Sequence, residues 1–203
     1  MPGDLSSDDA VAKLIADVRE RDIHVDILIN NAGIGLFENF LDAPLNHQME
    51  EIDLNVRAVV SLTHAFAPGM VAVQHGGIIN IASTAAFQPG PGAGIYAASK
   101  AFVLFFSEAL SFELQKSGVR VIAACPGPVA TIFFATMNPT LSADQMDKPA
   151  TVVREILTAF EKKQRIVVPG KLKNRLGTLG ARFLPRNTML RLAAGIMQQL
   201  DRH

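Results

Sequence analysis

The stretch Val25-Asp26-Ile27-Leu28-Ile29-Asn30-Asn31-Ala32-Gly33 decides the fold of this chain. It starts as a short, largely apolar run with three β-branched residues and changes to polar and small residues at Asn30. Buried strands of parallel sheets are apolar in this way, and their carboxyl ends commonly open into loops that face a ligand. The stretch therefore predicts a strand near Val25 that leads into a binding loop.

Two further predicted strands also lead directly into chemically active residues. The run at residues 78–82 follows the turn signal Gly76-Gly77 and delivers Ser83. The run at residues 119–124 leads into Cys125-Pro126-Gly127-Pro128-Val129-Ala130-Thr131. Because open α/β sheets bind ligands beyond the carboxyl ends of their strands, we expect these segments to meet at one site.

Helical patterns alternate with these strands along the whole chain. They are expected near residues 7–21, 46–73, 95–116 and 150–163, and a fourth strand is expected near Ile166. This alternation predicts an α/β fold with a doubly wound parallel sheet and right-handed crossovers. Pro68 is expected to end or kink the second helix. At 203 residues and 49% apolar content, the chain is expected to form one domain.

Tyr96 is the only tyrosine of the sequence, and Lys100 follows it by four positions. Residues at i and i+4 share one helix face, so the ammonium group can approach the phenol or a ligand bound beside it. A nearby cation lowers the pKa of a phenol, which is ordinarily near 10. An ordinary pair on a surface helix has the same spacing, so the pair by itself does not define a site.

Together these motifs resemble those of the short-chain dehydrogenase/reductase family, from about Asp4 to Gly170. The matching segments are Asn30-Asn31-Ala32-Gly33, Asn55 within Asp53-Leu54-Asn55-Val56, Ser83, the Tyr96 and Lys100 pair, and Pro126-Gly127-Pro128-Val129-Ala130-Thr131. The resemblance implies a Rossmann-like fold and an NAD(P)-dependent oxidoreductase that interconverts carbonyls and alcohols by hydride transfer.

The resemblance also assigns catalytic roles to four residues. Tyr96 would be the general acid/base, and Ser83 would polarise the same substrate oxygen. Lys100 would lower the pKa of Tyr96 and hold the nicotinamide ribose, while Asn55 would fix a water that links Lys100 to solvent. Two structural alternatives remain open, because Asn55 could satisfy backbone groups in a helix kink and Ser83 could cap a turn.

The cofactor implied by the resemblance is NAD or NADP. The residues expected to bind it are Asp4, Asn30, Asn31, Ala32, Gly33, Tyr96, Lys100, Pro126, Gly127, Val129 and Thr131. Asp4-Leu5 is similar to the acidic pair that contacts adenine in the family, yet no strand, glycine-rich turn and helix come before it. We therefore expect an N-terminally truncated sheet of about four or five strands and weakened cofactor binding. A misassigned start, a truncated gene and a genuine short form would each explain this.

A truncated sheet affects both the edge of the fold and the expected function. The strand near Val25 should be left as an exposed apolar edge. The alternative to an active enzyme is a catalytically silent family member that acts by protein association or by contact with a membrane surface.

Charge is divided unevenly between the body of the chain and its end. Residues 1–161 hold 18 acidic and 9 basic side chains, whereas residues 162–203 hold 1 acidic and 10 basic. We expect a main domain at residues 1–170 and a basic amphipathic helical extension of the same domain at residues 171–203. Apolar residues of this extension form one helical stripe: Leu172, Leu176, Leu179 and Phe183. Such a helix could lie on an anionic membrane. We favour a tail that caps the cleft or pairs with the acidic body.

Composition limits the remaining possibilities. One cysteine, Cys125, allows no intrachain disulfide, fits a reducing cytoplasmic location and is expected to be an inert core residue. The five histidines show no metal-ligand spacing, so no metal is expected. Neither a signal peptide, a membrane span nor a nucleic-acid motif is predicted.

Two partner expectations complete the interpretation. The helix that carries Tyr96 has a broad apolar face, and in the family this helix forms a subunit interface, so a homo-oligomer is expected. A largely apolar carbonyl or alcohol substrate is expected in a pocket formed by Phe87, Pro89, Pro91, Phe133, Phe134 and Met137.

Overall fold

A computed structural model describes residues 3–137 and 142–200 of the chain. In this part of the chain, four strands form one parallel sheet in the order β1-β2-β3-β4. Their bounds are β1 (Ile27–Asn30), β2 (Gly76–Ile81), β3 (Val119–Ala124) and β4 (Ile166–Val167). The predicted Rossmann-like α/β fold is confirmed.

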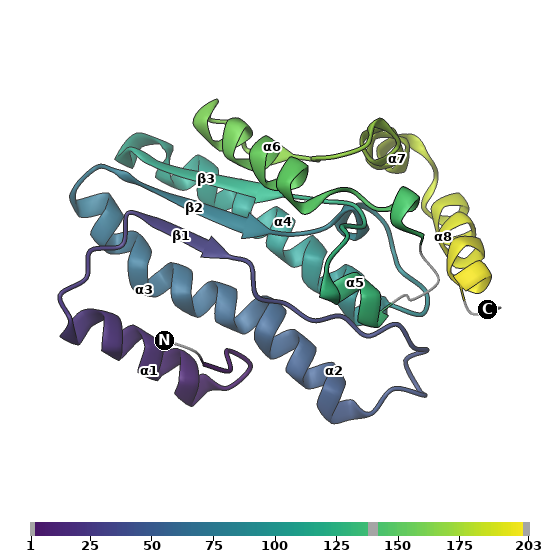
Figure 1. Cartoon of the computed structure of the whole chain (residues 1–203), viewed down its shortest axis with the longest axis horizontal. Helices are drawn as coiled ribbons and strands as arrows, with labels where there is room; N and C mark the ends of the chain where they lie inside the picture. The colour runs from purple at the N-terminus through teal and green to yellow at the C-terminus, as the bar shows by residue number, and fades with distance from the viewer. Residues whose placement is uncertain (1–2, 138–141, 201–203) are drawn as a thin grey trace.

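Helices cover both faces of the sheet (Figure 1). One face carries α1 (Asp8–Glu20), α3 (Ala58–Ala72) and α4 (Gly94–Leu114), and the other carries α6 (Pro149–Glu161). The remaining helices are α2 (Leu45–Ile52), α5 (Ile132–Met137), α7 (Leu172–Phe183) and α8 (Arg186–Leu200). A π-helical turn at Asp53–Arg57 joins α2 to α3, and short 3₁₀ turns lie at Thr84–Phe87, Gln115–Ser117 and Ala143–Gln145.

The core is divided between the two faces because successive strand residues point in opposite directions. Ile78 of β2 packs with Met70 of α3, whereas its neighbour Ile79 packs with Phe160 of α6. Both isoleucines are almost completely buried. Burial on both sides explains why the strands read as continuous apolar runs.

The strand β1 forms an open edge of the sheet, as predicted. Within the described ranges it pairs with β2 alone. Ile27 and Ile29 consequently remain 50% and 53% exposed. An apolar edge of this kind favours pairing with another segment.

The prediction for Pro68 was wrong in part, because the helix does not end there. The helix α3 continues through Pro68 to Ala72. Ala67 and Met70 are buried against β2 and β3, and this packing holds the turn that contains the proline. Tertiary contacts thus offset the loss of one backbone hydrogen bond.

The helix α4 is long and apolar, and one side of it lies in the core. With the turn that follows it, Gly94–Ser117 is the one helical stretch of the described chain that is long and apolar enough to cross a membrane. Its Val103 and Leu104 are buried in the core cluster that also contains Ala123 and Cys125 of the sheet region. Packing against the sheet accounts for the buried apolar residues of α4, whereas Phe102, Phe105 and Phe112 remain exposed.

The helices α7 and α8 lie beyond the carboxyl ends of the strands (Figure 1). Asp147 accepts hydrogen bonds from the Lys171 backbone N–H at 3.1 Å and from Asn174 Nδ2 at 2.9 Å. Arg175 pairs with Glu155 of α6 at 2.9 Å. The basic tail therefore contacts acidic residues of its own chain, while its apolar stripe, Leu172, Leu176, Leu179 and Phe183, remains exposed.

Candidate active site

A cavity of about 480 Å³ lies at the carboxyl ends of β1, β2 and β3. Most of the residues predicted to form the site line it: Asn31, Ala32, Gly33, Ser83, Tyr96, Lys100, Pro126, Gly127, Val129 and Thr131. The loops after three separate strands therefore meet at one place, as the parallel sheet requires.

Ser83 follows β2 and faces the Tyr96 phenol. Its hydroxyl accepts a hydrogen bond from the Ala85 backbone N–H at 3.1 Å and so caps the 3₁₀ turn. The same hydroxyl interacts with the Tyr96 side chain, and this hydrogen bonding acts to lower the pKa of Tyr96. Ser83 can therefore cap the turn and still present its hydroxyl to the Tyr96 phenol.

The Tyr96 phenol is buried, and burial raises its pKa above the ordinary value. The interaction with Ser83 lowers the pKa by less, and the nearby Glu51 carboxyl raises it further. The expected lowering by Lys100 is not found in this structure. Desolvation of the phenolate outweighs the neighbouring interactions.

Lys100 lies one helical turn beyond Tyr96, with its ammonium 5.8 Å from the centre of the Tyr96 ring. Its Nζ donates a hydrogen bond to the Ile81 carbonyl at 3.0 Å. Burial lowers the pKa of Lys100 to about 8, although the charge of Glu51 acts in the opposite direction. The shared helix face predicted from the spacing of Tyr96 and Lys100 is confirmed.

Asn55 lies in the π-helical turn and fixes the loop after β1. Its Oδ1 accepts from the Ile34 N–H at 3.0 Å, and its Nδ2 donates to the Ile34 carbonyl at 2.7 Å and to Ser99 Oγ at 3.1 Å. π-helical turns are often found at functional sites. Asn55 thus connects the binding loop to α4, and it satisfies backbone groups of that loop.

Gly33 is required by the close approach of this loop to the site. A Cβ atom at this position would lie 2.9 Å from Asn55 Oδ1 and 3.2 Å from Lys100 Nζ. A side chain would therefore displace the amide or the ammonium group.

Two residues predicted to bind cofactor lie outside the cavity. Asn30 is buried beneath the sheet, where its Nδ2 donates to Asn80 Oδ1 at 2.8 Å and to Thr63 Oγ1 at 3.2 Å. Strand alternation places it on the face opposite the cavity. The exposed Asp4 carboxylate accepts hydrogen bonds from Ser6, at 3.0 Å from the backbone N–H and 2.8 Å from Oγ.

A smaller cavity of about 150 Å³ adjoins Ser83 and Tyr96 on the expected substrate side. Its apolar residues include Phe134 and two that the sequence did not indicate, Phe37 and Ala193 of α8. The Phe37 ring lies 5.7 Å and the Phe133 ring 6.1 Å from the Tyr96 ring, measured between centres. A helix of the tail therefore contributes to the wall beside the phenol.

The other expected substrate residues are placed differently. Pro89 and Pro91 are absent from the walls of both cavities, and Gln88 and Gly90 line the smaller one. The Met137 side chain lies outside the described residues. Phe87, the last residue of the 3₁₀ turn after Ser83, lines neither cavity and packs against the core cluster that contains Val103.

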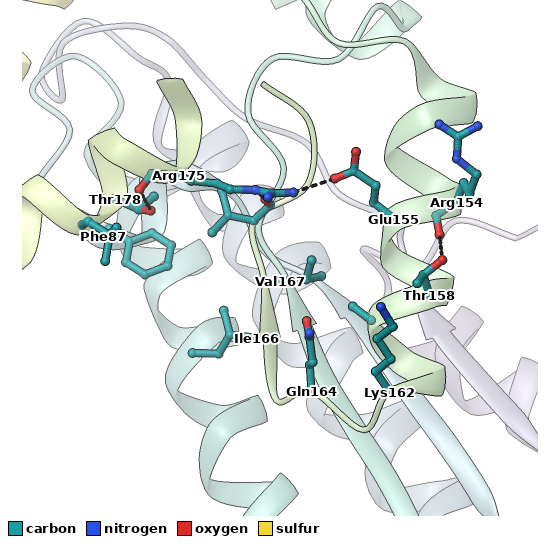
Figure 2. Close-up of a pocket in the computed structure, with 13 residues that line it drawn as sticks. Phe87, Arg154, Glu155, Thr158, Lys162, Gln164, Ile166, Val167, Arg175 and Thr178 are labelled. Carbon is teal, nitrogen blue, oxygen red and sulfur yellow. Dashed lines mark hydrogen bonds and ion pairs between the residues drawn. The ribbon is translucent and has the colours of Figure 1, made fainter. Parts of the chain in front are cut away.

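Phe87 lines a larger cavity, of about 630 Å³, between β4, α6 and α7. Figure 2 shows Phe87 beside Thr178 and the Arg175–Glu155 ion pair across the opening. Ser83, Tyr96 and Lys100 do not line this cavity. Its size alone does not make it the chemical site.

Two ionisable side chains, those of Cys125 and Glu51, are buried near the site. Cys125 is fully buried in the core, as predicted, and burial raises the pKa of its thiol to about 12. Glu51 is also fully buried, and the sequence reasoning missed it. Glu51 precedes Asn55 by four positions, so the two residues lie on the same helix face. This spacing is the sequence feature that could have indicated Glu51 as a site residue.

Comparison with known proteins identifies a family for this chain. Residues 1–142 match the model of the short chain dehydrogenase family. The oxidoreductase UcpA of Salmonella typhimurium is 33% identical over 156 residues, which are 74% of this chain and 57% of that protein. The NADP-dependent 3-hydroxy acid dehydrogenase YdfG of Escherichia coli K12 is 38% identical over 130 residues, 64% of this chain and 52% of that protein. The chain spans little more than half the length of these relatives.

Solved structures give the same result. A short-chain dehydrogenase from Sphingobium yanoikuyae in complex with NADPH superposes with a TM-score of 0.78 at 32% identity, covering 89% of this chain and 71% of that one. A bulky-bulky ketone specific alcohol dehydrogenase from Comamonas testosteroni gives 0.74 at 29% identity, covering 91% and 77%. The chain belongs to the short-chain dehydrogenase/reductase family.

Proposed function

We propose that this chain is an NAD(P)-dependent oxidoreductase that interconverts carbonyls and alcohols. The observation that carries the proposal is the convergence of Ser83, Tyr96 and Lys100 on one cavity at the carboxyl ends of the strands. Family membership and the names of the relatives support it.

The cavity has the features that a nicotinamide cofactor needs. The small residues Ala32, Gly33 and Gly127 let a flat ligand approach the backbone. Lys100 uses one N–H for the Ile81 carbonyl in the described chain, and an ammonium group has three donors. Lys100 is thus suited to bind ribose hydroxyls, and the loops at Asn31 and Thr131 are suited to hold the rest of the nicotinamide half.

The chemistry then divides between the cofactor and the chain. A bound nicotinamide would supply or accept the hydride at the substrate carbon. In reduction, the Tyr96 hydroxyl donates its proton to the carbonyl oxygen, and the Ser83 hydroxyl donates a hydrogen bond to the same atom. The raised pKa of Tyr96 keeps that proton available at neutral pH. The Ser83 hydroxyl, whose hydrogen bonding acts to lower the pKa of Tyr96, stabilises the phenolate that remains.

The substrate class follows from the walls beside Tyr96. Phe37, Phe133 and Phe134 surround the phenol with apolar surface. We therefore propose an apolar ketone or secondary alcohol rather than a charged sugar. The relative named for bulky ketones supports this choice.

The test is a titration of the purified chain with NADH and with NADPH, followed by nicotinamide fluorescence, and then reduction of an aryl alkyl ketone. We expect one cofactor to bind and turnover to be lost in Tyr96→Phe, which retains the ring and removes the proton. Absence of binding at millimolar cofactor, or equal turnover by Tyr96→Phe, would contradict the proposal.

A second candidate function is association without catalysis. The helix α4 presents an exposed apolar row that includes Phe102, Phe105 and Phe112. We propose that a second copy of the chain covers this row in a homo-oligomer. If cofactor does not bind, association through this surface becomes the favoured function.

A further inference from the structure

Glu51 is a buried carboxyl that the proposed chemistry does not yet use. Its side chain has no exposed surface, and neither carboxyl oxygen has a full hydrogen bond among the described residues. The Leu36 backbone N–H nevertheless lies close enough to favour its charged form. An incompletely paired buried carboxyl is costly, so its position beside the site calls for a functional explanation.

Within the described residues, Glu51 interacts electrostatically with two groups of the site, Lys100 and Tyr96. From α4, Lys100 favours the ionised form of Glu51, and Tyr96 is affected by the same carboxyl. Cys125, at the end of β3, also faces Lys100 and remains a neutral thiol. Asn55, one helical turn after Glu51, holds the loop over them.

The effects on the two catalytic groups have the same sign. A negative charge on Glu51 raises the pKa of Lys100, because it stabilises the ammonium. It also raises the pKa of Tyr96, because it opposes formation of the phenolate. The ionised carboxyl therefore favours a proton on both groups.

We propose that Glu51 is a positioning residue of the site, whose charge sets how firmly Lys100 and Tyr96 hold their protons. Ionised Glu51 favours the protonated phenol that carbonyl reduction needs, and neutral Glu51 favours the phenolate that alcohol oxidation needs. Burial raises the pKa of Glu51 to about 7, so both forms occur near neutrality. The effect on turnover rests on the proposed function, whereas the effect on Tyr96 does not.

The composition of the chain permits a direct test. Tyr96 is the single tyrosine and the sequence has no tryptophan, so the ultraviolet absorbance of tyrosinate reports Tyr96 alone. We compare wild type, Glu51→Gln, Glu51→Asp and the neighbouring exposed control Glu50→Gln. We expect the midpoint to move to lower pH in Glu51→Gln, to return toward wild type in Glu51→Asp and to stay unchanged in Glu50→Gln. Coincident midpoints in wild type and Glu51→Gln would overturn the proposal.

A second measurement covers the case in which a variant does not fold or alkali unfolds the chain first. Carbon-13 NMR of the glutamate carboxyls in the wild-type protein should show one group that titrates near the value of about 7. Titration of every glutamate near the ordinary value of 4.5 would overturn the proposal.

Turnover separates this proposal from the proposed function. In an active preparation, Glu51→Gln should shift the pH profile of alcohol oxidation to lower pH, while Glu50→Gln should not. If turnover is absent but the Tyr96 midpoint moves as expected, the proposed function fails and the role of Glu51 in setting the site's protonation stands.

Discussion

Asn55 holds Ile34 by both of its backbone polar groups, with the N–H 3.0 Å from Oδ1 and the carbonyl 2.7 Å from Nδ2. Asn55→Leu leaves these partly buried groups unpaired, and it also removes the bond to Ser99. We expect the free energy of unfolding to fall by about 2 to 4 kcal/mol, as measured by urea denaturation. Asn46→Ala, at an exposed position of α2, should change it by less than about 0.5 kcal/mol. Similar losses in both variants would contradict this role.

Gly33→Ala should damage the site through steric contact alone. The added methyl group would lie 2.9 Å from Asn55 Oδ1 and 3.2 Å from Lys100 Nζ. We expect a stability loss of about 1 to 3 kcal/mol, measured by thermal unfolding, together with weaker cofactor binding. The matched control is Gly69→Ala in α3, where the methyl group meets no atom within 4 Å and should stabilise by about 0.5 to 1 kcal/mol. An unchanged Gly33→Ala protein would show that the loop moves freely.

Lys100→Met should reveal the lowered pKa of Lys100 as a pH dependence of stability. In the folded chain the pKa is about 8 instead of 10.5, so between these values the unfolded chain binds more protons. Stability from this residue should therefore rise as pH increases through that window. The unfolding free energy of wild type minus that of Lys100→Met should therefore become more positive as pH rises through this window. The control is Lys116→Met, at an exposed position, for which the same subtraction should give a constant value. A constant difference would mean that Lys100 titrates as in the unfolded chain.

Asp147→Ala should detach the tail from the body of the chain. The buried Asp147 carboxylate accepts from the Lys171 N–H and from Asn174 Nδ2, at the start of α7. Loss of both bonds should cost about 1 to 3 kcal/mol and increase cleavage within α7 during limited proteolysis. Asp144→Ala is the control, because Lys171 contacts only the backbone carbonyl of that exposed residue. Equal cleavage rates would show that α7 is held by other contacts.

Phe105→Glu should separate the proposed homo-oligomer. Phe105 is 67% exposed on α4, so the substitution should leave the fold intact while placing a charge in the apolar row. Light scattering after size exclusion should give the monomer mass for this variant and a multiple of it for wild type. Leu41→Glu, which is 90% exposed in a loop, should retain the wild-type mass. A monomeric wild type would exclude the proposed interface at the concentration used.

The comparison of Ile29, Asn30 and Asn31 shows how far the sequence could predict the site. Asn31 lines the cavity with Ile29, but the intervening Asn30 points to the other face and bonds with Asn80. A motif read as a string places Asn30 and Asn31 together in the site. The period of two along a strand decides which of them reach it, and that depends on the exact strand bounds.

Phe87 was predicted to lie in the site but does not, whereas Glu51 lies beside the site and was not predicted. Phe87 is close to Ser83 in sequence, yet the 3₁₀ turn directs it into the other cavity. Glu51 shares the helix face of Asn55, but an acidic side chain on a helix is normally solvated. Its burial requires the packing of α2 against α4 beneath the binding loop, and no local pattern specifies this packing.

The sequence by itself determined the parallel sheet, the alternation of helices and strands and the shared face of Tyr96 and Lys100, because apolar periodicity and helical spacing are local properties. The tertiary structure alone decided that the pKa of Tyr96 is raised, that Glu51 is buried beside the site and that Ala193 of the tail lines its wall. The physical reason is that proton affinity depends on desolvation and on charges brought together from distant segments, and these are set only when the chain is packed.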